Sequence, residues 1–263
     1  AEDAVWNVLF DDDNLSRVIY DTRAALAALF NAPSPARVAF ASNSTEALNT
    51  AILGLFSAGD HVISTDLEHN SVLRPLYLLQ QQGVAVDFVP ADPQGQIHYE
   101  DFEKLLRPNT RAIVCTHASN LTGNVVDLEQ VSVIARTHNL YLVVDASQTA
   151  GAYPIDMEKM GISVLCFTGH KGLMGPQGSG MLILGRGVAL DTLMEGGNGM
   201  DSLRGEMSGD APERYEAGTL QTPAIAGLRA GMELVESVGV EALGAHGFSL
   251  GVGLRDRLPE IPK

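Results

Sequence analysis

The sequence predicts an α/β protein with a mostly parallel central sheet flanked by helices. From about residue 14 to Asp145, short apolar segments alternate with amphipathic ones, a pattern typical of parallel strands joined by helices. The segment Leu140–Val144 is apolar throughout, which indicates a strand buried on both faces. The chain has 263 residues, 45% of them hydrophobic, which is enough for one large domain with a substantial core.

Apolar periodicity, capping residues and turn residues place the individual elements. Asn14 is a suitable N-cap for the first helix, and Pro33 and Pro35 break the chain after it. The expected helices lie at 14–30, 45–56, 71–82, 99–106, 128–137, 223–238 and 241–258. The expected strands lie at 38–40, 61–64, 84–89, 112–115, 140–144, 164–167 and 179–184. In such sheets ligands bind beyond the carboxyl ends of the strands, so the polar residues there carry the functional information.

Charge and composition exclude several classes of partner. The formal net charge of −15 argues against nucleic acid and anionic membrane, since both bind clustered Lys and Arg. We expect no membrane span, because no apolar run is long enough, and no signal peptide at the N-terminus. Cys115 and Cys166 sit in apolar segments and are interpreted as reduced core residues, which favours a cytoplasmic location. No His, Cys and carboxylate spacing predicts a metal site.

Asp145 and Lys171 are polar residues that directly follow apolar strands. A carboxylate at Asp145 is costly unless something pairs with it, although a cap or a turn is an equally simple role. A lone lysine is usually a solvated surface charge. Lys171, however, is flanked by glycines and small residues in Thr168-Gly169-His170-Lys171-Gly172, where desolvation would make its amine nucleophilic.

Two further segments add an anion site and a ring-binding residue. Ser44 and Thr45 open a helix after the first strand, which is either a capping box or an anion site. His117 follows another strand, and His69 lies in a similar place; an isolated histidine is often structural. Each signal is weak alone. Successive strand ends, however, supply candidates for an anion-binding site, a ring-stacking residue, a carboxylate and a lysine amine, which could together form one site.

These motifs together resemble the class V aminotransferase family, which has fold type I of the enzymes that use pyridoxal 5'-phosphate (PLP). The cysteine desulfurase and selenocysteine lyase branch is the most similar. The resemblance covers about 14–240 and rests on six ordered segments, which are residues 44–49, 68–75, 116–120, 144–148, 168–172 and 214–219. It implies the fold described above and a homodimer with shared sites.

The resemblance implies a role for each matching residue. Lys171 would hold PLP as a Schiff base, and Asp145 would pair with the protonated pyridine nitrogen. Gln148 would bond the phenolic oxygen, and His117 would stack on the ring and could move protons. Asn120 would face the substrate carboxylate.

The phosphate of PLP would be held by several hydroxyl groups. Ser44 and Thr45 would bind it with help from Thr168 and His170, and the family usually has Ser where Thr168 stands. The pair Gly218-Thr219 would reach the phosphate of the partner subunit.

The chain also departs from the family pattern. We expect residues 14–240 to form the PLP-binding large domain and 241–263 to form a helix leading toward a small domain. The family's N-terminal pocket segment and its small domain, which carries a substrate-binding arginine and a sulfur-accepting cysteine, find no match. Neither Cys115 nor Cys166 corresponds to that cysteine.

The leading functional prediction is a cysteine desulfurase type of enzyme that removes sulfur from L-cysteine and leaves alanine. A sulfur-acceptor protein is then a possible partner. One alternative is another class V reaction, which could be transamination, β-elimination or epimerisation. The other is a non-catalytic PLP-binding or dimerisation module, or one half of a split enzyme.

Overall fold

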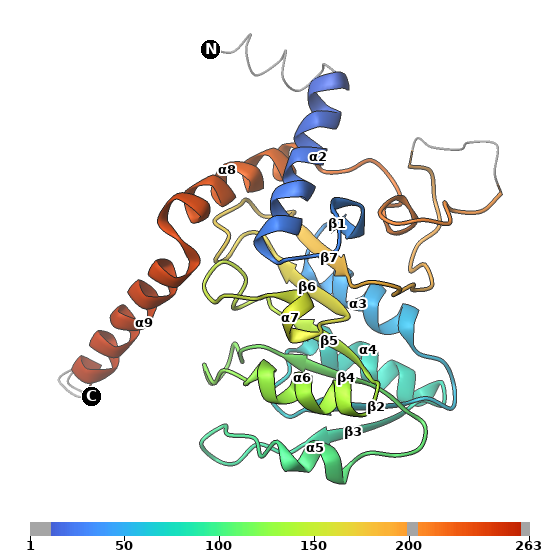
Figure 1. The fold of residues 1–263 in the computed structure, drawn as a ribbon, viewed down its shortest axis with the longest axis vertical. Helices are drawn as coiled ribbons and strands as arrows, with labels where there is room; N and C mark the ends of the chain where they lie inside the picture. The colour runs from blue at the N-terminus through green and yellow to red at the C-terminus, as the bar shows by residue number, and fades with distance from the viewer. Residues whose placement is uncertain (1–11, 199–204, 259–263) are drawn as a thin grey trace.

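A mixed seven-stranded sheet forms the centre of the protein, as the computed structural model shows for residues 12–198 and 205–258 (Figure 1). The strand order is β1-β7-β6-β5-β4-β2-β3. The strands are β1 (Val38–Ala41), β2 (His61–Thr65), β3 (Ala85–Val89), β4 (Thr110–Thr116), β5 (Tyr141–Asp145), β6 (Val164–Thr168) and β7 (Gly180–Leu184). The predicted α/β class and mostly parallel sheet are confirmed.

Strand β7 is antiparallel to both of its neighbours, and the other pairings are parallel. The carboxyl ends of the parallel strands therefore meet at one edge of the sheet, where β7 begins. There Gly180 lies opposite Ala41 on one side and Thr168 on the other. This edge is where a doubly wound sheet places its ligand.

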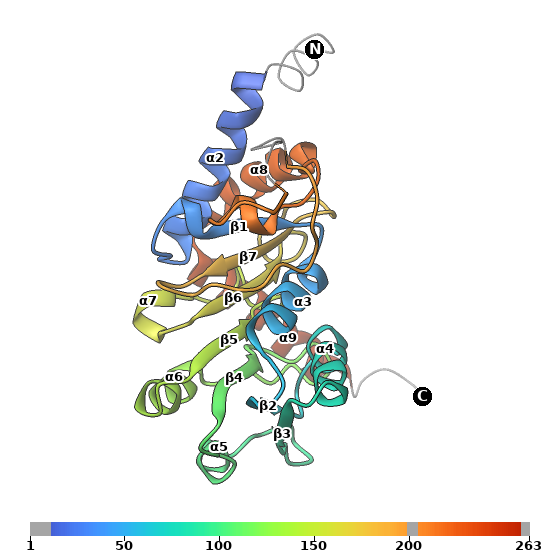
Figure 2. The same cartoon turned by 90° about the vertical axis from the view of Figure 1, so that its right-hand side faces the viewer.

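Helices cover both faces of the sheet (Figure 2). They are α2 (Asp12–Leu29), α3 (Ser44–Leu55), α4 (Asn70–Gln81), α5 (Glu100–Lys104), α6 (Leu128–Thr137), α7 (Met157–Met160), α8 (Thr222–Val238) and α9 (Val240–Arg257), with short 3-10 turns at Pro35–Arg37 and Glu213–Tyr215. One apolar core packs α3 and α4 on the sheet, and another packs α2, α6 and α8 on the opposite face.

The boundaries differ from the prediction in a few places. Helix α2 begins at Asp12, ahead of the predicted N-cap Asn14, and the helix expected at 99–106 spans only Glu100–Lys104. Helix α7 was not predicted, because four residues are too few to show helical periodicity. Its ends nevertheless carry ordinary signals, since Asp156 caps the first turn and Gly161 ends it with a φ of 62°.

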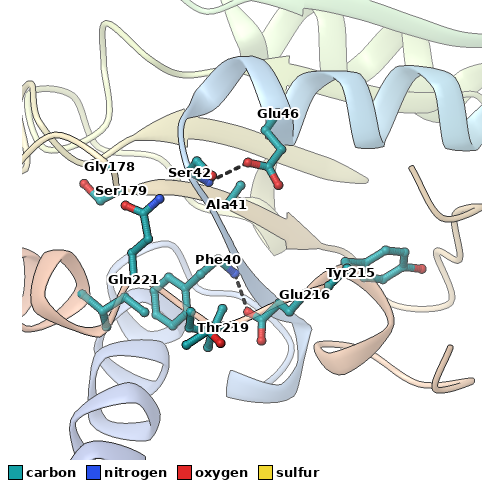
Figure 3. A pocket seen from close by; sticks show the side chains of 13 residues that line it. Phe40, Ala41, Ser42, Glu46, Gly178, Ser179, Tyr215, Glu216, Thr219 and Gln221 are labelled. Carbon is teal, nitrogen blue, oxygen red and sulfur yellow. Dashed lines mark hydrogen bonds between the residues drawn. The ribbon is translucent and has the colours of Figure 1, made fainter. Parts of the chain in front are cut away.

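A buried ion pair covers the outer edge of β1, which is the end strand of the sheet in the described residues. Arg23 of α2 donates two hydrogen bonds to the carboxylate of Glu216, at 2.8 and 2.6 Å. Glu216 also accepts from the backbone N–H of Phe40 at 2.6 Å, and Arg23 donates to the backbone oxygen of Val38 (Figure 3 shows the Glu216–Phe40 bond). The pair thus satisfies backbone groups of an edge strand and ties the segment after residue 213 to the sheet.

Cys115 and Cys166 are buried and free, which confirms their prediction as core residues. Among the described helices, none is both long enough and apolar enough to cross a membrane.

Candidate active site

Asp145 lies at the carboxyl end of β5, in the centre of the sheet, and only 4% of its surface is exposed. Its Oδ1 accepts hydrogen bonds from the backbone N–H of Ser147 at 2.9 Å and from the Ser147 hydroxyl at 2.5 Å. No hydrogen bond from the described residues reaches Oδ2. Burial raises the pKa of Asp145, while the bonds from Ser147 and the nearby charges of His69 and Lys171 oppose the rise.

Lys171 follows β6 in a glycine-containing loop beside the same edge. Its side chain is exposed, so the desolvation expected from the sequence is not found. Among the lysines in the described ranges, it is the one without an ion pair, since Lys104 bonds Asp101 and Lys159 bonds Glu129. Its amine is therefore available for a ligand.

The loop that carries Lys171 packs tightly on the turn after Asp145. A Cβ atom on Gly172 would lie 2.5 Å from the backbone oxygen of Ala150, and one on Gly151 would lie 2.5 Å from the oxygen of Gly172. This close backbone contact fixes the lysine loop relative to the end of β5.

His117 follows β4 and is 6% exposed. Its backbone N–H bonds the backbone oxygen of Asp145 at 2.9 Å, so the two residues lie side by side. Its Nδ1 is buried and has no partner among the described residues. Burial lowers the pKa of His117 to about 4, which keeps the imidazole neutral. The ring meets Tyr153 edge-on, with the ring centroids 5.9 Å apart.

We expect neutral His117 to make stability fall in acid. The unfolded chain takes up the proton below a pKa of 6.5, whereas folded His117 resists it until about 4. The contribution of neutral His117 to the free energy of unfolding is thus fully present above pH 6.5. This contribution, about 3 kcal/mol, is lost as pH falls toward 4. Urea denaturation of wild type and His117→Phe from pH 7 to 4 isolates this change, because other titrating groups are common to both. Parallel curves would contradict it.

Hydroxyl groups and a helix N-terminus gather beside the start of β7. Helix α3 begins at Ser44, with the side chain of Asn43 as its cap, and Thr45 Oγ1 lies 2.8 Å from Ser71 Oγ. On the other side of β7, Thr168 Oγ1 lies 2.7 Å from His170 Nδ1. The N-terminus of a helix with free hydroxyls binds anions such as phosphate.

Gly180 allows α3 to approach β7, so we expect Gly180→Ala to disturb the anion site. A Cβ atom there would lie 2.3 Å from the backbone carbonyl carbon of Asn43. The start of α3 must then shift, at a cost of about 1–3 kcal/mol. Gly197→Ala, which has open space around it, is the matched control and should stay near wild type in thermal melting. Equal melting temperatures for the two variants would contradict the close contact.

The remaining predicted residues lie farther from Asp145 or face solvent. Gln148 and Asn120 are exposed. Gly218 adopts a φ of 92°. Thr219 lines a separate cavity of about 60 Å³ together with Ser42 and Gln221, between β1 and the start of β7 (Figure 3). The structure therefore groups Asp145, His117 and Lys171, and it places Gly218 and Thr219 on the side of β1.

Several site residues escaped the sequence analysis. Ser147 bonds Asp145, and the Asp-x-Ser spacing is a local turn signal that could have revealed it. Ser71 joins the starts of α3 and α4 through Thr45 and His69, a long-range contact without a sequence signal. Within the described residues, no cluster of His, Cys, Asp and Glu could hold a metal ion.

A comparison with protein families shows which family the chain belongs to. Residues 12–263 match the family described as Aminotransferase class-V. The chain belongs to the class V aminotransferase family. A class V relative, a probable cysteine desulfurase of Methanothermobacter thermautotrophicus, is 32% identical over 240 residues, which cover 89% of this chain and 60% of the relative.

Two solved structures have closely similar folds to this chain. An apo cysteine desulfurase of Thermococcus onnurineus has a TM-score of 0.87 at 30% identity, covering 94% of this chain and 63% of that one. The cysteine desulfurase CsdA of Escherichia coli has a TM-score of 0.86 at 27% identity, and the match covers 95% of this chain and 65% of CsdA. The chain thus spans about 60–65% of the length of these relatives.

Proposed function

We propose that this chain binds PLP and acts on an amino acid, with cysteine desulfurase chemistry as its reaction. The observation that carries the proposal is the meeting of buried Asp145, neutral His117 and the unpaired amine of Lys171 at one strand edge. Relatives named cysteine desulfurase support the reaction type. When bound, PLP supplies an electron sink for charge that develops on the substrate.

The residues present fit this cofactor. The free Oδ2 of Asp145 suits a protonated ring nitrogen, since a buried carboxylate needs a positive partner. The neutral ring of His117 has an unsatisfied Nδ1, which a bound ligand or its substrate would satisfy. A lysine amine without an ion pair suits covalent attachment of an aldehyde.

Each side chain then has a defined task in the proposed enzyme. Lys171 anchors the cofactor and exchanges protons with the substrate, and Asp145 keeps the ring nitrogen protonated. His117 covers the ring and excludes water from it. Gln148 is exposed and free to turn toward the phenolic oxygen, and Asn120 is available for the substrate carboxylate.

The phosphate would be held at the start of α3. Ser44 and Thr45 offer hydroxyls and helix N–H groups, and Thr168 with His170 adds donors from the end of β6. We assign Gly218 and Thr219 to the phosphate of a partner subunit in a homodimer.

The proposal extends to the assembly and domain organisation. We propose a homodimer that passes sulfur to an acceptor protein, and residues 14–240 as the PLP-binding domain. Helix α9 has no buried residue, which supports the proposal that 241–263 lead toward a further domain.

Product analysis tests the reaction. The full chain, purified with PLP, is incubated with L-cysteine and dithiothreitol as reductant, with Lys171→Ala as the control. Desulfuration predicts equal amounts of alanine and sulfide from wild type alone. Pyruvate with ammonia and sulfide would indicate β-elimination, 3-mercaptopyruvate, the 2-oxo acid that keeps the sulfur, would indicate transamination, and D-cysteine would indicate epimerisation. Bound PLP without any product would favour the non-catalytic module.

A further inference from the structure

Glu68 is a buried carboxyl group that the proposed chemistry does not use. It lies in the turn after β2 and is 8% exposed. Its Oε1 accepts hydrogen bonds from the hydroxyl of Thr65 at 2.6 Å and from the backbone N–H of Thr116 at 2.9 Å. Its Oε2 is buried with no partner among the described residues. A side chain with one satisfied and one unsatisfied oxygen in the interior calls for a reason.

The bond to Thr116 places Glu68 at the strand end that carries His117. Strand β4 pairs with β2 only as far as Ile113, so the N–H of Thr116 has no partner from β2. Glu68 supplies that partner. On the opposite side, the N–H of His117 bonds the backbone oxygen of Asp145 at 2.9 Å. The end of β4 is thus held between Glu68 and β5.

The charges around Glu68 favour its neutral form. The pKa of Glu68 is raised to about 8, mainly by burial; the hydrogen bonds from Thr65 and Thr116 oppose the rise, and the charge of Asp145 adds to it. Cys115, below it on β4, is a buried thiol whose own pKa is also raised by burial. The nearby positive charges, His69 and Lys171, act on Asp145. At neutral pH the proton therefore resides on the carboxyl of Glu68, so Glu68 adds no second negative charge beside Asp145.

We propose that Glu68 is a positioning residue: its Oε1 holds the end of β4, and so His117, while its Oε2, which has no partner among the described residues, adds no second negative charge beside Asp145. Only the test that measures PLP affinity rests on the proposed function. The contacts of Glu68 with the end of β4, at Thr116 and His117, do not depend on it.

A double-mutant cycle on PLP affinity tests the positioning role. Glu68→Leu leaves the N–H of Thr116 unsatisfied, and we expect PLP to bind about 10-fold more weakly. Glu68→Gln keeps an acceptor without charge and should stay within about twofold of wild type. In a His117→Ala background, Glu68→Leu should add little. Equal losses for Leu and Gln, or full additivity with His117→Ala, would overturn the proposal. Thr65→Val, which removes the other donor to Oε1, is the matched control.

A second readout needs no cofactor and keeps the inference separate from the proposed function. In cofactor-free protein, the amide signal of Thr116 should shift with a midpoint near pH 8 in wild type and lose this shift in Glu68→Gln. A midpoint near pH 4.5 would show an ionised Glu68 at neutral pH and would overturn the neutral role. If wild type bound no PLP yet showed the midpoint near 8, the proposed function would fail while the placement of Glu68 stood.

Discussion

Arg23→Met is expected to lower the free energy of unfolding by about 3–5 kcal/mol, because it leaves the buried carboxylate of Glu216 without its partner. The side chains of both residues are less than 10% exposed, at 9% and 6%. Both terminal nitrogens of the guanidinium group bond the carboxylate, so methionine fills part of the volume but replaces neither bond.

The loss of unfolding free energy caused by Arg23→Met should increase as the pH rises. Burial already raises the pKa of Glu216, and Arg23 opposes this rise. Without Arg23 the pKa of Glu216 rises further, so the folded variant keeps a proton that the unfolded chain releases above its ordinary value of 4.5. Stability relative to wild type is therefore lost as pH rises above the pKa of Glu216 in the folded wild type, which itself lies above 4.5.

Urea denaturation at pH 5 and pH 8 measures both the loss and its pH dependence. Arg186→Met is the matched control, since Arg186 and its partner Glu158 are 75% and 42% exposed and the pair contributes at most about 1 kcal/mol. If Arg23→Met cost no more than this control at pH 8, the ion pair would not stabilise the edge of β1.

Asp145→Asn is expected to lower turnover by about 10- to 1000-fold, on the proposed function. An opposite charge within a few ångströms shifts a pKa by about 1–3 units, so loss of the carboxylate reduces the protonated fraction of the ring nitrogen by that factor. The variant should remain folded, because an amide oxygen still accepts from Ser147 and a buried charge is removed.

The measurement for Asp145→Asn is turnover of L-cysteine beside a urea denaturation curve. Asp127→Asn is the control, because Asp127 caps α6 and lies outside the proposed site. Turnover of Asp145→Asn equal to that of Asp127→Asn would contradict the role of Asp145. A large loss of folding in Asp145→Asn would instead make its carboxylate a structural group.

Local sequence signals predicted the fold class and most elements, because each strand is a short apolar run and most helices carry an amphipathic face. Strand β5 could be predicted from local sequence, since the apolar run Leu140–Val144 covers all of it except its last residue, Asp145. Order within the sheet is different. The sequence did not reveal that β7 is antiparallel or that it lies between β1 and β6, because the pairing of β7 with β1 joins residues far apart in the chain, such as Val38 and Ile183.

The same limit applies to the site. Asp145, Lys171 and His117 could be proposed as site residues because each lies at or after the end of a strand, and the edge of a parallel sheet brings strand ends together. Glu68 could not be assigned, since its significance depends on contact with Thr116, 48 residues away. Arg23 and Glu216 were also missed, since they pair across 193 residues.

Borohydride reduction followed by peptide mapping tests the central claim most directly. The full chain is saturated with PLP, reduced, digested and analysed by mass spectrometry. The chain contains four lysines, so the attachment point is resolved without ambiguity. We predict the pyridoxyl group on Lys171 alone and its absence from Lys171→Ala. A group on Lys104 or Lys159, or no labelled lysine at saturation, would contradict the assignment of Lys171 as the anchor of the cofactor.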